Sequence, residues 1–166
     1  MSEVKPIVKN PNPVLRQKAK LVPPKKISEE EFTEIIGNMK STLNATPNGI
    51  GLAAPQIGHS WRIFIVKIPE YEGVFINPEI MDIGKRTTLL EEGCLSVTDT
   101  YGPVARPKTI KIKALNEQGL PFKVRAKGLL ARVIQHEIDH LDGTLFIDKA
   151  EKTYRVERQN QITGNE

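Results

Sequence analysis

Near the start of the chain, apolar residues recur at the spacing of one face of a helix. Ser28 and Glu31 form the pattern of a capping box, in which side chains at the start of a helix satisfy free backbone N–H groups. The apolar residues that follow stand one helical turn apart: Phe32, Ile35, Ile36, Met39 and Leu43. We therefore expect an amphipathic helix over residues 28–46.

From residue 62 to residue 127 the pattern changes to short apolar or alternating runs, which are typical of strands. In the last two runs, apolar residues alternate with polar ones, and Asn116–Gly119 supplies a turn between them. These two runs are predicted to form a hairpin with one face in solvent. Glycine, proline and asparagine separate the runs, which occupy residues 62–67, 74–81, 85–90, 108–115 and 120–126.

A second helix is predicted after the hairpin. Gly128 interrupts the strand pattern, Leu129–Leu141 follows a helical period, and Gly143 provides a stop. The order of helix, strands and helix indicates an α+β fold. We expect mainly antiparallel β-sheets packed around a central C-terminal helix, with the amphipathic helix near the N-terminus.

Composition agrees with an ordinary globular protein, since 39% of the 166 residues are hydrophobic and 27% are charged. No internal repeat, low-complexity run or Gly/Ser linker divides the chain, so we expect a single domain over residues 1–166. The N-terminus lacks the apolar segment of a secretory signal, and the run Ile63–Val66 is too short to span a bilayer. We therefore expect a cytoplasmic protein that does not enter a membrane.

The charge balance is weakly basic. Lys and Arg number 24 against 20 Asp and Glu, which gives a formal net charge of +4. The sequence contains no recognisable nucleic-acid motif and no interleaving of basic and aromatic residues, so a solvated basic surface is the favoured interpretation. Transient association near RNA stays open.

The chemistry of the chain is concentrated in the motif His136-Glu137-Ile138-Asp139-His140, which is H-E-x-x-H on the predicted C-terminal helix. A step of four residues returns both imidazoles to nearly the same side of a helix, so both can reach one metal ion. The alternative is a chance match. Two apolar stripes on the same helix argue against it, because they bury the histidines where a metal is the most economical partner.

Glu137 follows the first histidine directly and is placed to take a proton from a water molecule on such an ion. A catalytic site also needs a third protein ligand and an open position. The metzincin arrangement is excluded because its third histidine is replaced here by Phe146. The remaining candidates for the third ligand are His59, a downstream carboxylate such as Glu151 or Glu157, and Cys94.

The local sequence favours Cys94, the only cysteine of the chain. The stretch Glu91–Ser96 places the thiol beside Gly93 at the end of a predicted strand, where the backbone can approach a ligand sphere closely. A single cysteine cannot form an internal disulfide. If Cys94 does not bind a metal, the alternative is that it is a small buried apolar residue.

Three separated motifs resemble those of peptide deformylases in their compact bacterial form. They are Gly49-Ile50-Gly51-Leu52-Ala53-Ala54-Pro55-Gln56, Glu92-Gly93-Cys94-Leu95-Ser96 and Gln135-His136-Glu137-Ile138-Asp139-His140, and the stretch Pro13–Arg16 adds to the likeness. The resemblance implies a metal-dependent hydrolase that removes the N-formyl group from the N-terminal formylmethionine of nascent polypeptides and releases formate. It also implies an α+β fold.

The resemblance further implies the roles of individual residues. Cys94, His136 and His140 would bind Fe²⁺, which Zn²⁺, Ni²⁺ or Co²⁺ can replace in a purified sample. Metal-bound hydroxide would attack the formyl carbonyl, with Glu137 as general base. The side-chain amide of Gln56 and the backbone N–H of Leu95 would stabilise the negative charge that develops on the carbonyl oxygen.

By the same resemblance, N-formylmethionyl peptides would pair with an exposed strand edge formed by Gly49, Ile50 and Gly51. The apolar side chains of Leu90, Leu129 and Val133 would form the methionine pocket. Transient proximity to the ribosome and a monomeric state are expected as well.

Two features depart from the family pattern. Thr98 and Tyr101 stand where many members have a proline and a basic residue. The tail is less basic than that of relatives that dock on the ribosome, so we assign no such docking to it; its charges are Glu151, Lys152, Arg155, Glu157, Arg158 and Glu166.

Two other functions compete with this interpretation. One is an H-E-x-x-H metallopeptidase whose third ligand is a downstream glutamate. The other is a non-enzymatic, metal-stabilised interaction domain that retains an inactive site. The complete motif around Cys94 favours the deformylase.

Overall fold

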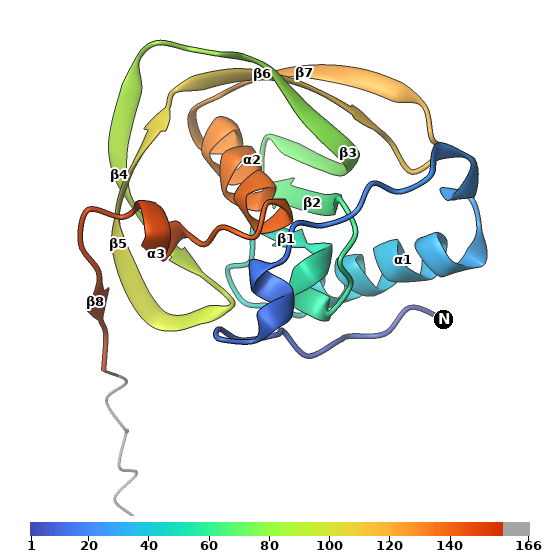
Figure 1. The fold of residues 1–166 in the computed structure, drawn as a ribbon, viewed down its shortest axis with the longest axis horizontal. Helices are drawn as coiled ribbons and strands as arrows, with labels where there is room; N and C mark the ends of the chain where they lie inside the picture. The colour runs from blue at the N-terminus through green and yellow to red at the C-terminus, as the bar shows by residue number, and fades with distance from the viewer. Residues whose placement is uncertain (158–166) are drawn as a thin grey trace, which may run out of the picture.

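Two antiparallel sheets enclose one central helix in the computed structural model, which describes residues 1–157 (Figure 1). The helices are α1 (Glu30–Asn44), α2 (Gly128–Leu141) and α3 (Phe146–Lys149), with short 3₁₀ turns η1 (Pro13–Arg16), η2 (Pro24–Lys26) and η3 (Ala54–Ile57). The strands are β1 (Gly51–Ala53), β2 (Ile63–Ile68), β3 (Tyr71–Ile83), β4 (Thr87–Cys94), β5 (Val97–Pro107), β6 (Thr109–Leu115), β7 (Pro121–Lys127) and β8 (Tyr154–Arg155). The predicted α+β class is confirmed.

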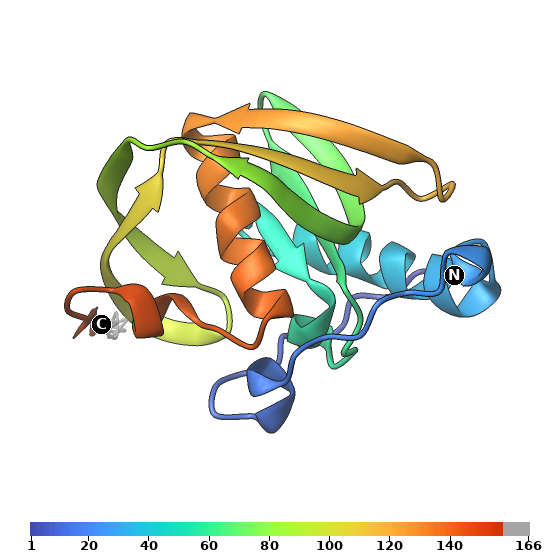
Figure 2. The ribbon, with the colours of Figure 1, turned by 45° about the horizontal axis from the view of Figure 1, so that its top comes forward.

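The larger sheet has the strand order β1-β2-β3-β6-β7, and the smaller has the order β4-β5-β8. Helix α2 lies between them and contacts strands of both sheets (Figure 2). Because β1 is at the edge of the larger sheet, only one of its two sides is paired, through β2. The start of β1 at Gly51 lies against α2, close to Val133 and Glu137.

Helix α1 is amphipathic as predicted, but its predicted cap is wrong. The five apolar residues of the expected stripe are all buried. The helix begins at Glu30, and Glu29 occupies the cap position without a side-chain hydrogen bond. The turn that continues η2 explains the shift, because Glu29 N–H bonds to Lys26 O at 2.9 Å and the buried Ile27 fixes residues 27 and 28 before the helix.

The predicted strands all occur, with ends shifted by a few residues. The hairpin of β6 and β7 has its expected solvent face, since Ile110, Ile112 and Ala114 are buried while Lys113 is exposed. Strand β5 was missed. Its inward positions include a buried arginine, Arg106, and the strand contains three residues that usually interrupt strands: Gly102, Pro103 and Pro107.

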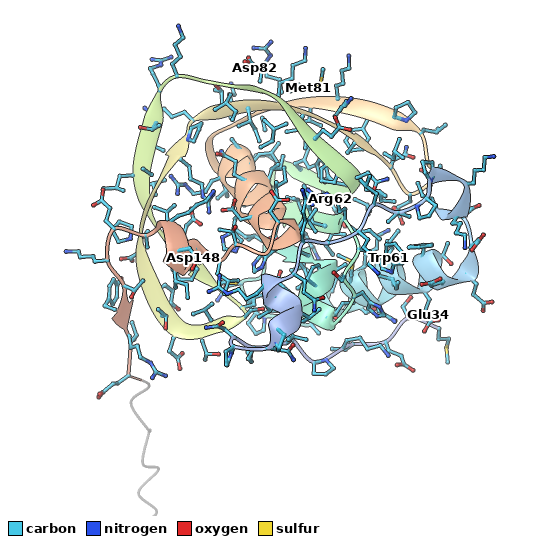
Figure 3. The ribbon with its side chains drawn as sticks, viewed as in Figure 1. Glu34, Trp61, Arg62, Met81, Asp82 and Asp148 are labelled. Carbon is cyan, nitrogen blue, oxygen red and sulfur yellow. The ribbon has the colours of Figure 1, made fainter. Side chains whose placement is uncertain are left out.

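Helix α2 is buried over residues 131–135 and 137–141, as the two apolar stripes predict. Gly143 ends it with φ +74°, and a Cβ there would lie 2.5 Å from Arg16 O, so glycine is required at this position. Arg62, labelled in Figure 3, donates to Leu141 O at 3.1 Å and to Asp142 Oδ1 at 2.9 Å, so it satisfies one backbone carbonyl at the C-terminal end of the helix. No helix within residues 1–157 combines the length and the apolar character needed to cross a membrane.

Candidate active site

Helix α2 and the end of β4 bring three potential metal ligands together. His136 and His140 lie one turn apart on α2, with ring centroids 5.0 Å from each other. Cys94 ends β4, and its Sγ lies 3.2 Å from His140 Nε2. The ligand atoms of all three residues lie within 4.8 Å of one another. Sequence reasoning named this set, and the fold places it at one point.

The donor set fits a divalent metal ion. His136 Nδ1 is 3.0 Å from Glu92 Oε1, so this bond engages Nδ1 and leaves Nε2 for an ion, the arrangement found around metal-binding histidines. One thiolate and two imidazoles suit a borderline ion such as Fe²⁺ or Zn²⁺ and leave a fourth position open. The other candidates for the third ligand, His59, Glu151 and Glu157, are not part of this group.

Glu92 lies behind His136 in a buried network of charges. Arg106 donates to it twice, from Nε at 2.6 Å and from Nη2 at 2.9 Å, and Arg132 Nη1 donates at 2.6 Å. Burial by itself would raise the pKa of Glu92, but the hydrogen bonds from Arg106 and His136 lower it to about 2. Glu92 is therefore a carboxylate that holds the His136 ring in one orientation.

The network continues to a second carboxylate on α2. Arg106 Nη1 donates to Asp139 Oδ2 at 2.9 Å, and Lys149 Nζ donates to Asp139 Oδ1 at 2.8 Å. Asp139 directly precedes His140, so Arg106 joins β4 and β5 to the helix segment that carries both imidazoles. This network was not predicted. Its only signal in the sequence is a charged residue, Arg106, at an inward position between apolar residues.

Glu137 is buried beside the three potential ligands, and its Oε2 has no hydrogen-bond partner among the described residues. Burial raises the pKa of its carboxyl group to about 7. A Cβ on Gly51 would lie 2.5 Å from Glu137 Oε1 and 3.0 Å from Val133 Cγ1. Glycine at position 51 therefore allows this carboxylate to approach the edge strand β1.

The side chain of Gln56 is fixed by contacts at both ends of its amide. Its Oε1 accepts the Ala53 N–H at 2.9 Å, and its Nε2 donates to Ser96 Oγ at 3.2 Å. Nε2 also lies 3.7 Å from Cys94 Sγ. The N–H₂ group of Gln56 therefore lies next to Cys94. Like most buried polar groups, it has hydrogen-bond partners.

A segment near the N-terminus ties the two loops that carry Gln56 and Leu95. Val8 N–H bonds to Gln56 O at 2.8 Å, Asn10 N–H bonds to Ser96 O at 2.8 Å, and Lys9 Nζ donates to Leu95 O at 2.5 Å. Residues 8–10 therefore link η3 to the turn between β4 and β5. Sequence reasoning gave no role to this segment.

A cavity of about 450 Å³ opens beside these residues. Nearly all of the predicted site residues line it; the set is Gly49, Ile50, Gly51, Gln56, Cys94, Leu95, Leu129, Val133, His136 and Glu137. His140 is fully buried behind them. Tyr101 and Arg132 also line the cavity, although no site role was predicted for either.

Of the predicted site residues, Leu90 is the one that belongs neither to the cavity wall nor to the three potential metal ligands. It is 53% exposed and is absent from the cavity wall, whereas its neighbour Glu91 contributes to that wall. The tail residues Glu151, Lys152, Arg155 and Glu157 are exposed, and Arg158 and Glu166 lie outside the described residues. Tyr154 in β8 donates a hydrogen bond to Glu91 beside the cavity.

Comparison with known proteins places these features in a family. Residues 4–156 match the family model of polypeptide deformylase. A peptide deformylase from Natranaerobius thermophilus is 45% identical, with 95% of this chain and 99% of the relative covered. The crystal structure of peptide deformylase from Thermotoga maritima has a TM-score of 0.85 at 39% identity, covering 90% of this chain and 99% of that chain. A Met-Ala-Ser-bound peptide deformylase from Acinetobacter baumannii has a TM-score of 0.83 at 36% identity, covering 89% and 99%.

Proposed function

Because this chain belongs to the polypeptide deformylase family and removes the formyl group from nascent peptides, we propose that Cys94, His136 and His140 hold the metal ion of that reaction. The observation that carries the proposal is the convergence of one sulfur and two imidazoles within 4.8 Å of one another, in the same cavity as a buried glutamate. Deformylases depend on a metal, and this is the group of ligands that the described residues offer.

Fe²⁺ is the proposed native ion, and Zn²⁺, Ni²⁺ or Co²⁺ can take its place in a purified sample. A mixed thiolate and imidazole set is compatible with each of these ions. A divalent ion supplies Lewis-acid chemistry when it is bound, since it polarises a carbonyl group and lowers the pKa of water.

Glu137 is proposed as the general base. Its Oε2 has no partner among the described residues and its pKa is raised to about 7 by burial, so it can accept a proton and release it near neutral pH. The proton would pass to the leaving amine of the peptide. The Gln56 amide and the Leu95 N–H would donate to the carbonyl oxygen as negative charge develops there.

The substrate is proposed to pair with the free side of the edge strand at Gly49, Ile50 and Gly51. Pairing through the main chain tolerates varied sequences, as processing of many nascent chains requires. Leu129 and Val133 line the cavity and are proposed to contact the methionine side chain. Leu90 is left out of this pocket because it lies outside the cavity wall.

The wider setting is also proposed. N-formylmethionyl peptides would be the substrates of a monomeric, cytoplasmic enzyme built as one catalytic domain over residues 1–166, acting in transient proximity to the ribosome. The H-E-x-x-H peptidase alternative is not favoured, because Glu151 and Glu157 are exposed and Cys94 is the residue that stands beside His136 and His140.

The test is to incubate the metal-loaded protein anaerobically with formyl-Met-Ala-Ser and, separately, with Met-Ala-Ser. The proposal predicts formate release from the first peptide, no cleavage of the second, and no formate release from either peptide by Glu137→Gln. Cleavage between Met and Ala would instead support a peptidase. Inactivity toward both peptides would support a metal-stabilised interaction domain.

A further inference from the structure

The excess positive charge of this protein is concentrated in one hairpin. Residues 108–127, which form β6, its turn and β7, contain six of the 24 cationic residues of the chain and one of its 20 acidic residues. The rest of the chain therefore holds 18 cationic and 19 acidic residues and is close to neutral. The formal net charge of the whole chain is only +4, but the charge of this hairpin segment alone is +5.

The strand register collects five of these six cations on the outer face of the sheet. Lys111 stands directly opposite Arg125, and Lys113 stands directly opposite Lys123. Like charges at opposed positions of neighbouring strands destabilise a sheet. A stable fold gains nothing from these pairs, so they are better explained by a ligand of opposite charge than by the needs of the hairpin itself.

Few acidic groups offset this face. Among residues 1–157, the one ion pair formed by the hairpin cations of the outer face joins Lys113 Nζ to Glu79 at 3.1 Å, and both side chains are about half exposed or more. Asp82 stands opposite Lys111 at the neighbouring strand β3, near the outer margin of the molecule (Figure 3). The loop that contains Lys85 and Arg86 runs beside the start of β6, since Lys108 N–H bonds to Arg86 O at 2.8 Å. This loop adds two more cationic residues near the hairpin.

The outer face carries charge without aromatic groups. The one aromatic side chain of the hairpin, Phe122, points inward and packs on Phe75 with ring centroids 5.3 Å apart. Bases therefore have no ring on which to stack, and the face offers ammonium and guanidinium groups alone. This chemistry fits phosphates and gives no readout of sequence.

We propose that the outer face of β6 and β7 binds the phosphate backbone of structured RNA. The hairpin face of Lys111, Lys113, Lys123, Arg125 and Lys127 is a row of cations, and the exposed apolar residues near it, Leu120, Met81 and Ile83, lie in the turn and on β3 instead of between these cations. A continuous row of cations favours a phosphate backbone over a lipid surface, which is entered by an apolar face. Binding there leaves the enzyme working, because no residue of β6 or β7 lines the catalytic cavity. The face would hold the protein at an RNA surface from which nascent chains emerge.

The experiment measures fluorescence anisotropy of a fluorescein-labelled RNA stem-loop titrated with the full-length protein over a series of salt concentrations. The test variant is K111Q/K123Q/R125Q, which keeps the Lys113–Glu79 ion pair. The matched control is K18Q/K20Q/K152Q, whose three lysines are exposed and lie outside the hairpin. Each triple lowers the formal net charge from +4 to +1.

The wild-type protein and the control should bind the stem-loop with similar micromolar affinity at low salt, the range of non-specific phosphate binding. The test variant should bind about tenfold or more weakly, with a salt slope smaller by about 3, roughly one for each lost phosphate contact. Its thermal stability should not fall, because opposed like charges are removed, and its deformylase activity should be unchanged.

Three results would overturn the proposal. The first is no binding of the stem-loop by the wild-type protein at low salt. The second is equal weakening in both triples, which would mean that net charge alone attracts RNA. The third is binding to vesicles with anionic headgroups that is lost in the test variant while RNA binding is retained, which would assign the face to a membrane.

Discussion

The substitution Glu92→Gln tests whether the buried charge network orients the metal ligands. Glu92 Oε1 accepts hydrogen bonds from Arg106 Nη2 and lies 3.0 Å from His136 Nδ1, and Oε2 accepts from Arg106 Nε and Arg132 Nη1. An amide keeps one acceptor oxygen and turns the other into an N–H₂ group. In either orientation of the amide, two donors would face another donor. Arg132 would lose its charged partner, and Arg106 would keep only Asp139.

The size of the effect follows from the burial of the network. The side chains of Glu92 and Arg106 are 6% and 3% exposed, so solvent cannot replace the lost contacts. Removing one partner of a buried ion pair costs about 3–5 kcal/mol of unfolding free energy. For a domain of this size, that loss lowers the melting temperature by roughly 6–20 °C. Loss of a hydrogen bond behind a metal-binding histidine weakens metal binding by about 10–100-fold.

The matched control is Glu91→Gln, because Glu91 is the neighbouring residue, is exposed and carries the same charge. Thermal unfolding of the zinc-loaded proteins measures stability, and competition with a chelator measures metal affinity. The control should lose less than about 1 kcal/mol and retain the ion as the wild type does. Retention of wild-type metal affinity by Glu92→Gln, or equal losses in both variants, would refute the role of the network.

Three further substitutions test other parts of the site. Gln56→Ala should lower kcat by about 100-fold or more with little change in KM for a formylated tripeptide, because a donor to the developing oxyanion is lost; an unchanged kcat would remove Gln56 from that role. Gly51→Ala should lower kcat without loss of metal, because the added Cβ would lie 2.5 Å from Glu137 Oε1 and displace this carboxylate. A wild-type rate would show that the position of Glu137 tolerates the added methyl group. Lys9→Met should lower kcat while Lys18→Met does not, since Lys9 Nζ donates a hydrogen bond to the Leu95 carbonyl. Equal rates in the two variants would show that this contact does not affect catalysis.

Helices α1 and α2 and the paired histidines could be predicted from the sequence because their signals are local, whereas the short helix α3 was not predicted. His136 and His140 are one turn apart on a helix whose apolar stripes are clear, and the stop at Gly143 follows from its backbone conformation. The third ligand is different. Cys94 is 46 positions from His140, and spacing alone left it beside other candidates until the resemblance to a family singled it out.

The charged interior could not be read from the pattern of apolar residues. Arg106, Arg132 and Glu92 are buried, yet charged residues ordinarily indicate solvent-exposed positions. For the same reason strand β5 was missed, since Arg106 occupies one of its inward positions. Leu90 differs in the opposite direction, because the resemblance assigns this apolar residue to a pocket and the structure leaves it 53% exposed and outside the cavity wall. In each case the tertiary contact, rather than the local pattern, decides the environment.

The central claim is that one sulfur and two imidazoles hold the catalytic ion. X-ray absorption spectroscopy of the zinc-loaded protein tests it most directly. The predicted first shell contains one sulfur at about 2.3 Å and two imidazole nitrogens at about 2.0–2.1 Å, and the sulfur should disappear in Cys94→Ser. A shell of nitrogen and oxygen alone in the wild-type protein, with the thiol reduced, would contradict the account.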